Sequence, residues 1–581
     1  MASIRLLPFV WGVSLLGICF LFSSASNQAQ DPTSSDWDGH PDVTLLDEAG
    51  NPVDPTAPSP APYSPKQTCG QCHDYDAITA AYHFQMGADR ISDDYGTKQG
   101  RPWVSSDGQF GRQFHMSYEW LGKKKNGSAA EVGLSAYQFE LSCGKCHPGG
   151  GLAELDRNGN RMDKHQAANP GIAASFDGDY FAAEWVKSGV VEADCLICHQ
   201  PKYDFAGRWQ QLSQGNFRWA ASVGARLATV EGSVLAGQTP KLRYQGVAKD
   251  GTVRLQIGRV TDANCLLCHG EAEVKKRGHV WDGRNEDIHS SRGMKCTSCH
   301  VTGADHQIRK GRSNEVTLRD DLDDPTLSCE SCHARGELGA KKPQHPSTPP
   351  SHLKSIACVT CHVRDQNVTA VLAVDTTTGA AIGVPTHPEA KKYGESFEWS
   401  MSLFRLADGR IYAGNALLPV WWGHRDGDII YPLTLAETKA AYLRAQAAIK
   451  DDNGDGKPEA NTESEILAML EALRSTLSGG RFSRPNPVYV KGHTVYAETA
   501  GKVTKSEHRQ AQPLRWTFSH NVAAASRALG AQGCKDCHTT PHSRFLHAPI
   551  VLDPYDENGK RSTIQMWKHL KIDETVITAG Q

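Results

Sequence analysis

The sequence has almost no cysteine to spare. Of its 17 cysteines, all but Cys19 belong to eight Cys-x-x-Cys-His motifs. A separate disulfide framework or a cysteine-rich zinc site is therefore excluded in the mature chain. The chain also lacks an excess of charge of either sign, because 62 Lys and Arg face 65 Asp and Glu, a formal net charge of -3 at pH 7. Without a basic run, we expect no binding to nucleic acid.

Long apolar runs are missing beyond the N-terminus. Residues 1–26 have the pattern of a secretory signal peptide, with Arg5 before an apolar core at residues 6–22 and small residues from Ser24 to Ser26. An uncleaved membrane anchor is the alternative, although the run is barely long enough to span a bilayer. Residues 27–66 are rich in proline and predict a linker. We expect an exported protein, periplasmic or extracellular, with no transmembrane segment after cleavage.

What the sequence does contain is Cys-x-x-Cys-His eight times, with four copies between residues 265 and 362. This pentapeptide is the attachment signal for c-type haem, in which two thiols bond to the porphyrin and the His becomes the proximal iron ligand. A redox dithiol or half of a zinc knuckle could explain one copy, but eight copies favour eight haems. The predicted haem-binding residues are Cys69, Cys72, His73, Cys143, Cys146, His147, Cys195, Cys198, His199, Cys265, Cys268, His269, Cys296, Cys299, His300, Cys329, Cys332, His333, Cys358, Cys361, His362, Cys534, Cys537 and His538.

The composition also bears on the fold. A hydrophobic content of 39% and a mean hydropathy of -0.48 predict a modest protein core, to which eight porphyrins would add apolar bulk. We therefore expect a mainly α fold with much irregular structure, the fold of a multihaem cytochrome c with one shared haem-packed core. Residues 67–370 would hold seven haems, residues 371–533 none, and residues 534–581 the eighth haem and a tail. Capping boxes at Thr434 and Thr462 predict a helical hairpin within the haem-free region.

The second axial ligand of each iron would decide the function. An imidazole on both faces suits electron transfer, whereas an open face suits catalysis. Eight of the 25 histidines are proximal, so the other 17 exceed the need. Mainly from their positions near motifs, the predicted distal ligands are His83, His115, His279, His289, His306, His352, His424 and His520. The sequence leaves His345, His387, His542 and His547 unassigned, and His40 is the least expected ligand.

Two oxygen-rich loops are candidates for Ca²⁺. The first contains Asp156 and Asp163, but Arg161 stands where an EF-hand loop has Gly, which favours a solvated turn. The second, residues 451–456, matches the first half of an EF-hand loop, although Thr462 replaces the Glu expected at its twelfth position. Both Ca²⁺ and a plain polar loop fit the second segment.

Several stretches around the motifs carry a family resemblance. They are Val274–His279, Asp287–His289, Asp305–Ile308 with Gly311–Arg312, Ser519–Val522 and Ala528–Leu529. With these, the chain resembles the octahaem cytochromes c of the tetrathionate reductase family, relatives of hydroxylamine oxidoreductase, over roughly residues 190–370 and 515–545. The resemblance implies distal-ligand roles for His279, His289, His306 and His520, and redox chemistry on a small sulfur or nitrogen compound.

The chain also departs from that family. It has no Cys-x-x-Cys-Lys motif, which often marks the catalytic haem of such reductases. Hydroxylamine oxidoreductases cross-link a Tyr from a long helical region after the last haem, and here only Tyr555 follows the eighth motif. Both departures argue against a simple transfer of either activity.

Two functions follow from the motifs. The first is an electron-transfer protein in anaerobic-type respiration, with a quinol-side donor and a terminal acceptor or other cytochromes as redox partners, and with an oligomer allowed. The second is a multi-electron oxidoreductase of the tetrathionate, sulfite, nitrite or hydroxylamine type, acting at one open haem. The second motif, Cys143–His147, is the candidate for that haem because a glycine-rich turn follows it. The sequence identifies no catalytic residue.

Overall fold

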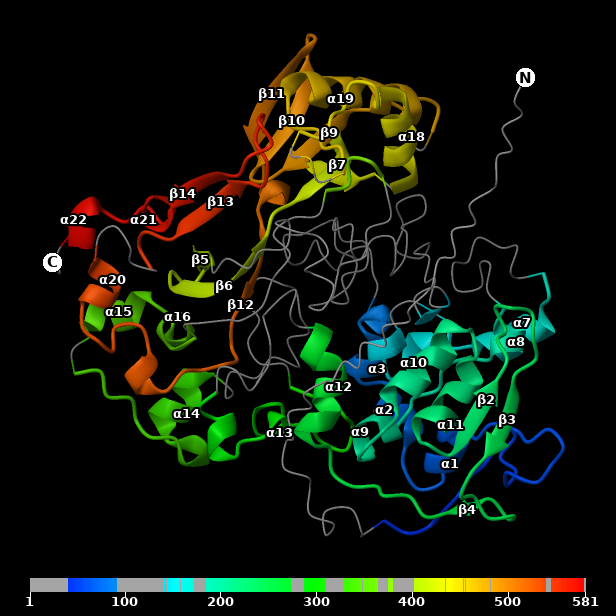
Figure 1. Ribbon diagram of the computed structural model, residues 1–581. Helices are drawn as coiled ribbons and strands as arrows, with labels where there is room; N and C mark the ends of the chain where they lie inside the picture. Colours follow the sequence, from blue (N-terminus) through cyan, green and yellow to red (C-terminus); the bar gives the residue numbers. More distant parts are fainter. Residues whose placement is uncertain are drawn as a thin grey trace, which may run out of the picture.

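The structure, a computed structural model, describes most of the chain in several segments (Figure 1). They are residues 40–90, 137, 140–141, 144–156, 158–171, 184–272, 287–309, 328–346, 348–363, 375–379, 402–433, 435–452, 454, 456–480, 482–539 and 545–578. The N-terminal segments lie at the lower right of Figure 1, residues 328–363 at the lower left, and the strands of residues 420–507 at the top.

The secondary structure is mixed, so the prediction of a mainly α fold is wrong. Helix accounts for 35% and strand for 17%, and the strands form five small antiparallel sheets. Segments rich in Val, Tyr and Thr, such as residues 487–499, favour strands because β-branched and aromatic side chains suit a pleated surface. The strands are β1 (Val43–Thr44), β2 (Ala228–Glu231), β3 (Lys241–Tyr244), β4 (Thr252–Val253), β5 (Ser402–Arg405), β6 (Ile411–Leu417), β7 (Val420–Asp426), β8 (Ile429–Pro432), β9 (Pro487–Lys491), β10 (Thr494–Thr499), β11 (Lys502–Glu507), β12 (Leu514–Thr517), β13 (Pro549–Asp553) and β14 (Ser562–Gln565).

Most helices are short and lie at or near the motifs. They are α1 (Pro65–Cys69), α2 (Tyr75–Thr79), α3 (Tyr82–Gln85), α7 (Met162–Ala168), α8 (Trp185–Ser188), α9 (Leu196–His199), α10 (Phe205–Ser213), α11 (Ala220–Gly224), α12 (Asp262–Ala272), α13 (Cys296–Cys299), α14 (Cys329–Arg335), α15 (Pro350–Ser355), α16 (Cys358–His362), α18 (Leu435–Ala445), α19 (Glu463–Leu477), α20 (Lys535–His538), α21 (Met566–His569) and α22 (Glu574–Thr578). The second motif forms a 3₁₀ turn, η4 (Gly144–Cys146).

The motif-free part is built on a five-stranded sheet in the order β11-β10-β9-β7-β8, against which α19 packs. Helices α18 and α19 lie against each other, in the region where the capping boxes predict a hairpin. Thr462 and Glu465 form the capping box of α19 as predicted, each accepting a hydrogen bond from the other's backbone amide.

Apolar side chains do not gather in one shared core. Those of the described residues form separate clusters, including one around Trp185 and Phe217, one around Leu45 and Leu196, and one between the large sheet and α19. The prediction of a single core is therefore wrong, because each group of elements buries its own side chains. Residues 43–63, expected to be part of a linker, contribute buried Leu45, Val53 and Tyr63 to the second of these clusters.

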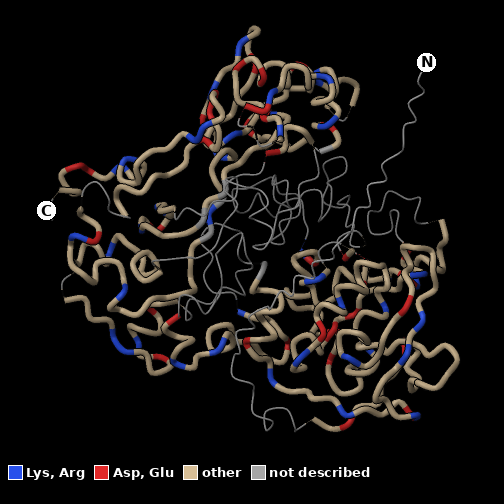
Figure 2. Tube along the Cα trace, viewed as in Figure 1, with Lys and Arg blue, Asp and Glu red and all other residues tan. Residues whose placement is uncertain are grey.

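The distribution of charge and the hydropathy of the helices can also be described. Lys and Arg alternate with Asp and Glu along the described segments, which agrees with the nearly neutral composition (Figure 2). Within the part of the chain that the structure describes, no helix is long and apolar enough to cross a membrane.

Candidate functional site

Each motif whose backbone is described folds as a single helical turn. The amide of the motif His donates to the carbonyl of the first Cys, at 3.0 Å in the first motif, 3.1 Å in the third and 2.9 Å in the fifth and the eighth. Residues three and four apart in such a turn share one face. The two thiols and the imidazole of a motif therefore point to the same side, which is the arrangement that two thioether bonds and one axial ligand require.

The described motif thiols form no disulfides and keep some exposure to solvent. None of the 15 described motif cysteines is in a disulfide and none is buried, whereas free Cys is otherwise among the most buried residue types. Hydrogen bonding by Cys329 lowers the pKa of the Cys358 thiol to about 7, whereas desolvation raises the pKa of the Cys299, Cys361 and Cys537 thiols. These thiols fit a role as attachment points better than a role in packing.

The thiols also show which motifs are neighbours. Thiols of the first and third motifs, the second and fourth, the fourth and fifth, and the sixth and seventh lie close enough to influence each other's pKa; the pairs are Cys69 with Cys195, Cys146 with Cys268, Cys265 with Cys296, and Cys329 with Cys358. Cys299 of the fifth motif interacts electrostatically with Cys332 of the sixth, and Cys361 of the seventh with Cys537 of the eighth. Helix α12, which holds the fourth motif, contacts α9, α13 and η4. The motifs thus form one continuous series.

Six motif histidines each face a second imidazole at nearly the same separation. The distances between ring centroids are 6.2 Å for His83 and His269, 6.0 Å for His199 and His306, 6.2 Å for His289 and His333, 6.1 Å for His300 and His520, 6.3 Å for His345 and His362, and 6.1 Å for His352 and His538. A bond between a metal and a His nitrogen is about 2 Å long, so two imidazoles on opposite sides of one iron have centroids roughly 6 Å apart. The six pairs have this spacing.

Hydrogen bonds orient several of these rings. The Nδ1 atoms of His199, His300 and His333 lie 2.9, 2.7 and 2.9 Å from the carbonyls of Gly258, Arg309 and Lys341. Donation through Nδ1 leaves Nε2 as the atom available to a metal. Burial lowers the pKa of His199 and of His362, which keeps these imidazoles neutral, as ligation requires.

Five of the eight predicted distal ligands lie in these pairs: His83, His289, His306, His352 and His520. Two others, His115 and His279, lie outside the described residues, as does Cys143. The eighth, His424, belongs to β7 and stacks on Phe482 at 3.9 Å, and its Nδ1 accepts a hydrogen bond from the amide of Asn486. Its predicted role has no support in this geometry.

Sequence reasoning missed His345, which faces His362. The only indication in the sequence is that His345 lies within the run of closely spaced motifs. The same indication is stronger for His352, which is closer to Cys358. Proximity in sequence does not choose the partner, since His352 faces His538 of the eighth motif.

For the first and second motifs, the described residues show no imidazole pair. His147 of the second motif has an interaction partner. His73 of the first motif is exposed, and no imidazole of the described residues faces it.

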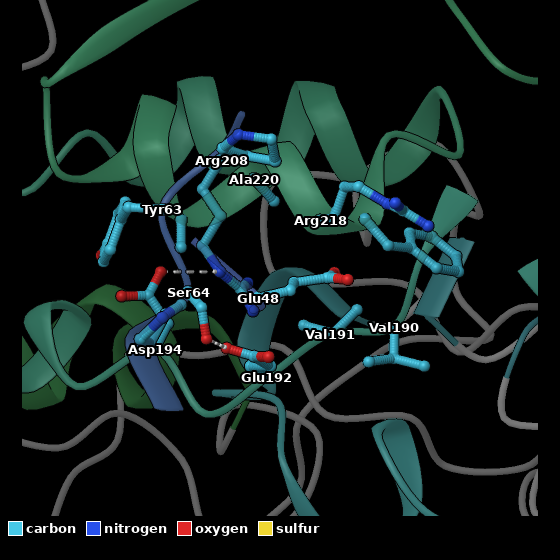
Figure 3. A pocket seen from close by; sticks show the side chains of 14 residues that line it. Glu48, Tyr63, Ser64, Val190, Val191, Glu192, Asp194, Arg208, Arg218 and Ala220 are labelled. Atoms are coloured by element: carbon cyan, nitrogen blue, oxygen red, sulfur yellow. Dashed lines mark hydrogen bonds and ion pairs between the residues drawn. The ribbon is translucent and has the colours of Figure 1, made fainter. Parts of the chain in front are cut away.

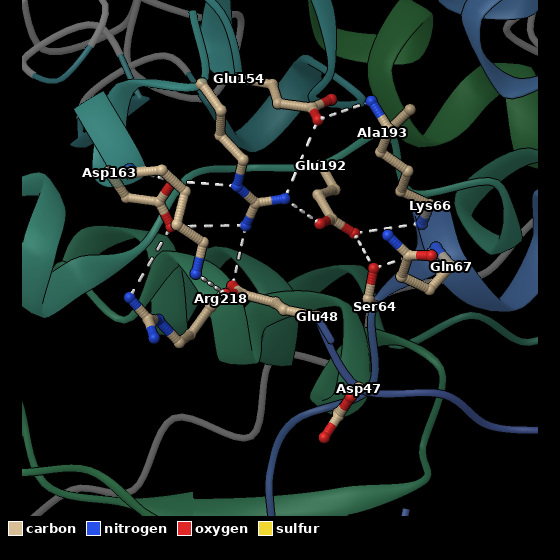
Figure 4. A network of polar contacts seen from close by, with 12 residues as sticks. Asp47, Glu48, Ser64, Lys66, Gln67, Glu154, Asp163, Glu192, Ala193 and Arg218 are labelled. Carbon is tan, nitrogen blue, oxygen red and sulfur yellow. Dashed lines mark hydrogen bonds and ion pairs between the residues drawn. The ribbon is translucent and has the colours of Figure 1, made fainter. Parts of the chain in front are cut away.

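In each of the two candidate calcium loops, an aspartate accepts hydrogen bonds from backbone amides of its own turn. Asp156 accepts hydrogen bonds from the amides of Asn158 and Asn160, each at 2.9 Å, and so closes its own turn. The neighbouring carboxylates instead surround the Arg161 guanidinium, which reaches Glu48 at 2.8 Å and Asp163 at 2.9 Å and also binds Glu192 (Figure 4).

In the second loop, Asp451 accepts hydrogen bonds from the amides of Gly454 and Gly456, each at 2.8 Å. Asn453 and Asp455 lie outside the described residues. Over the described segments, no group of three or more His, Cys, Asp or Glu side chains is arranged to hold a metal ion. Calcium binding therefore stays a prediction.

Comparison with known proteins gives no relative: no family model, no curated protein and no solved structure matches the chain.

Proposed function

We propose that the chain is an exported octahaem cytochrome c that carries electrons along eight covalently bound haems. The observation that carries this proposal is the set of six imidazole pairs with centroids 6.0–6.3 Å apart, each containing one motif His. The motif thiols would hold the porphyrins, and the paired imidazoles would fill both axial positions. Bound in this way, haem supplies one-electron redox chemistry without an open coordination position.

The spacing of the rings also weighs against zinc. Two His ligands of a tetrahedral zinc ion, each with a Zn–N bond of about 2 Å, would have ring centroids only about 5 Å apart. A zinc site would also gather Cys and His around one point, and the described residues contain no such group. A redox dithiol would not explain why each of six motif histidines faces a second imidazole.

The contacts between motifs support a path for electrons. They run from the first motif through the third, fourth, fifth, sixth and seventh to the eighth, and the second motif joins at the fourth. A redox partner at the N-terminal motifs and another near the eighth would then exchange electrons at separate surfaces. The signal-like residues 1–26 support export, and the stretches that resemble the tetrathionate reductase family support the haem count.

The test begins with the haem content of the protein produced in a host that attaches c-type haem. Mass spectrometry and the pyridine haemochrome assay should both give eight haems per chain, and a clearly lower number would contradict the proposal. EPR of the oxidised protein should be dominated by low-spin iron. The His352–His538 rings are nearly parallel at 15°, which gives a rhombic signal, whereas the His345–His362 rings at 75° give a signal with a large maximal g value.

A ligand substitution tests the pairing itself. The change His306→Met should alter the EPR signal and the potential of one haem of the eight while the haem content stays the same, because His306 faces His199. His424→Met is the matched control, since that ring packs on Phe482 and should leave every iron unchanged. The proposed pairing fails if the two variants have the same spectrum as the wild type.

A second candidate function, favoured by one observation, is a multi-electron oxidoreductase at the first motif. His73 is exposed, so a haem held there would be accessible to a small substrate. The second motif, which the glycine-rich turn suggests from sequence, stays the other candidate for an open haem. A small sulfur or nitrogen compound is the substrate class that the family resemblance implies.

The same EPR experiment separates the two functions. An open haem gives a high-spin ferric signal that cyanide or sulfite perturbs, and the double change Cys69→Ser with Cys72→Ser should remove that signal. If all signals are low-spin and neither ligand changes them, the protein only transfers electrons.

A further inference from the structure

A buried carboxyl group without a hydrogen bond lies beside the second motif. Glu140 is completely buried, and neither of its carboxylate oxygens has a hydrogen-bond partner in the described structure. An ionised carboxylate in such a place is costly unless a charge compensates it, so most buried polar groups are paired. This exception calls for a physical explanation.

The carboxyl group of Glu140 lies against the backbone of the second motif. A Cβ atom added at Gly144 would lie 2.4 Å from Oε2 of Glu140, so this carboxyl group lies close to the backbone of Gly144. Gly144 begins η4, the turn that contains Cys146. Glu140 therefore lies against the backbone that would hold the second haem.

One cation faces Glu140, and it is shared. Arg208 of α10 is buried and donates to the carbonyls of Gly144 at 2.8 Å and His147 at 2.7 Å. Its Nε atom lies 3.5 Å from buried Asp194 (Figure 3). Asp194 also accepts a hydrogen bond from Tyr203.

The guanidinium of Arg208 therefore compensates the charge of two buried carboxyl groups, those of Glu140 and Asp194. When both carboxyl groups are ionised, one negative charge remains uncompensated. Burial raises the pKa of Glu140 to about 7, against the opposing charge of Arg208. At neutral pH this group is therefore ready to bind or release a proton.

We propose that Glu140 is a proton-exchange site coupled to electron uptake at the second motif. When one electron reaches the haem held by Cys146 and His147, Glu140 takes up one proton from solvent, and both leave on reoxidation. The electron comes from the neighbouring fourth motif, whose Cys268 contacts Cys146. The only bond formed is the O–H bond of the carboxyl group. The driving force is the extra negative charge, which raises the proton affinity of a carboxylate in a poorly screened interior.

This inference rests on the proposed function, and the test keeps the two apart. The haem count comes first: fewer than eight haems contradict the proposed function, whereas eight haems allow the proton to be examined separately. The oxidised and reduced holoprotein are then compared by redox titration between about pH 6 and pH 8, which brackets the region in which a carboxyl group of this kind titrates.

The redox titration should show one haem whose potential falls as pH rises. A tenfold change in proton concentration corresponds to about 59 mV for full coupling to one electron, so the slope should lie below that limit. Glu140→Gln should remove the slope and leave eight haems. Glu465→Gln is the control, because it makes the same change at a buried carboxyl in the capping box of α19, and it should retain the slope.

Infrared difference spectra of the wild-type protein give a second measurement that does not depend on the folding of a variant. Reduction near neutral pH should produce the carbonyl band of a protonated carboxylic acid, shifted in D₂O. A wild-type spectrum without this band overturns the inference, and so does a Glu140→Gln protein that retains the full pH slope.

Discussion

The motif-bearing region and the sheet of residues 420–507 are stabilised in different ways. Around the motifs, helices such as α9 and α13 have four residues each, and the thiols lie unburied at their surfaces. In the sheet region, α19 has 15 residues and covers a continuous core that includes fully buried Trp422 and Tyr489. The sheet region therefore obtains its stability from one continuous apolar core. The motif region buries separate apolar clusters around Trp185 and around Leu45, and bound haem would add to its stability.

The histidine rings of the two regions also differ in how they pack. In the motif region, imidazoles face one another with centroids 6.0–6.3 Å apart. In the sheet region, His424 packs directly on Phe482 at 3.9 Å. A direct stack is the ordinary packing of a buried aromatic ring. The spacing alone does not separate the two classes, because His493 of the sheet region faces His569 at 6.3 Å and neither residue belongs to a motif. The presence of one motif His in each of the other six pairs is what supports ligation.

Loss of haem attachment in the middle of the series should have the largest effect. The double change Cys296→Ala with Cys299→Ala removes the thiols of the fifth motif, which joins the fourth motif to the sixth. Limited proteolysis should then cut residues 144–363 at least about tenfold faster, the effect of roughly 1.4 kcal/mol, while residues 420–507 stay protected. Cys19→Ala is the control and should change nothing. Equal protection of both regions would break the comparison.

Truncation of a core side chain in the sheet region should destabilise that region and leave the motif region unchanged. Leu470 is completely buried between α19 and the sheet, so Leu470→Ala should lower the free energy of unfolding of the sheet region by about 2–5 kcal/mol. The haem content and the EPR spectrum should not change. Denaturant unfolding followed by tryptophan fluorescence measures the effect. Leu443→Ala, at a position that is 54% exposed, is the matched control with a change near zero.

The pH dependence of stability should be localised to the motif region. Burial raises the pKa of Glu140 from 4.5 to about 7, so its proton is bound more tightly in the folded state. Its contribution to stability is complete below about pH 4.5 and is lost as pH rises through 7, a change of about 3 kcal/mol. Denaturant unfolding at several pH values should show this loss in the wild type and not in Glu140→Gln. A variant with the wild-type pH profile would contradict the assignment.

The smallest effect is expected at a helix cap. Thr462 caps α19, and Thr462→Ala should cost the sheet region about 1 kcal/mol without affecting the haems. Thr462→Ser keeps the hydroxyl and should restore most of the loss. Thermal unfolding of the two variants provides the measurement, and equal melting temperatures would show that the cap hydroxyl contributes nothing.

Local chemistry was predictable from the sequence. A Cys-x-x-Cys-His motif occupies one helical turn, so its two thiols and its imidazole share a face wherever the chain places them. The same holds for the capping box of Thr462 and Glu465, which lie three residues apart. Such features depend on neighbours in sequence and need no knowledge of the fold.

The long-range arrangement was decided only by the tertiary structure. His352 lies six residues before the seventh motif and yet faces His538 of the eighth, and His345, which the sequence leaves unassigned, faces His362. The strands of the sheets and the meeting of Glu140 with Arg208 likewise join residues far apart in sequence. The number of Cys-x-x-Cys-His motifs can be read from the sequence because each motif is a local pattern, whereas the imidazole pairs, the separate cores and the contacts between motifs depend on how distant segments pack.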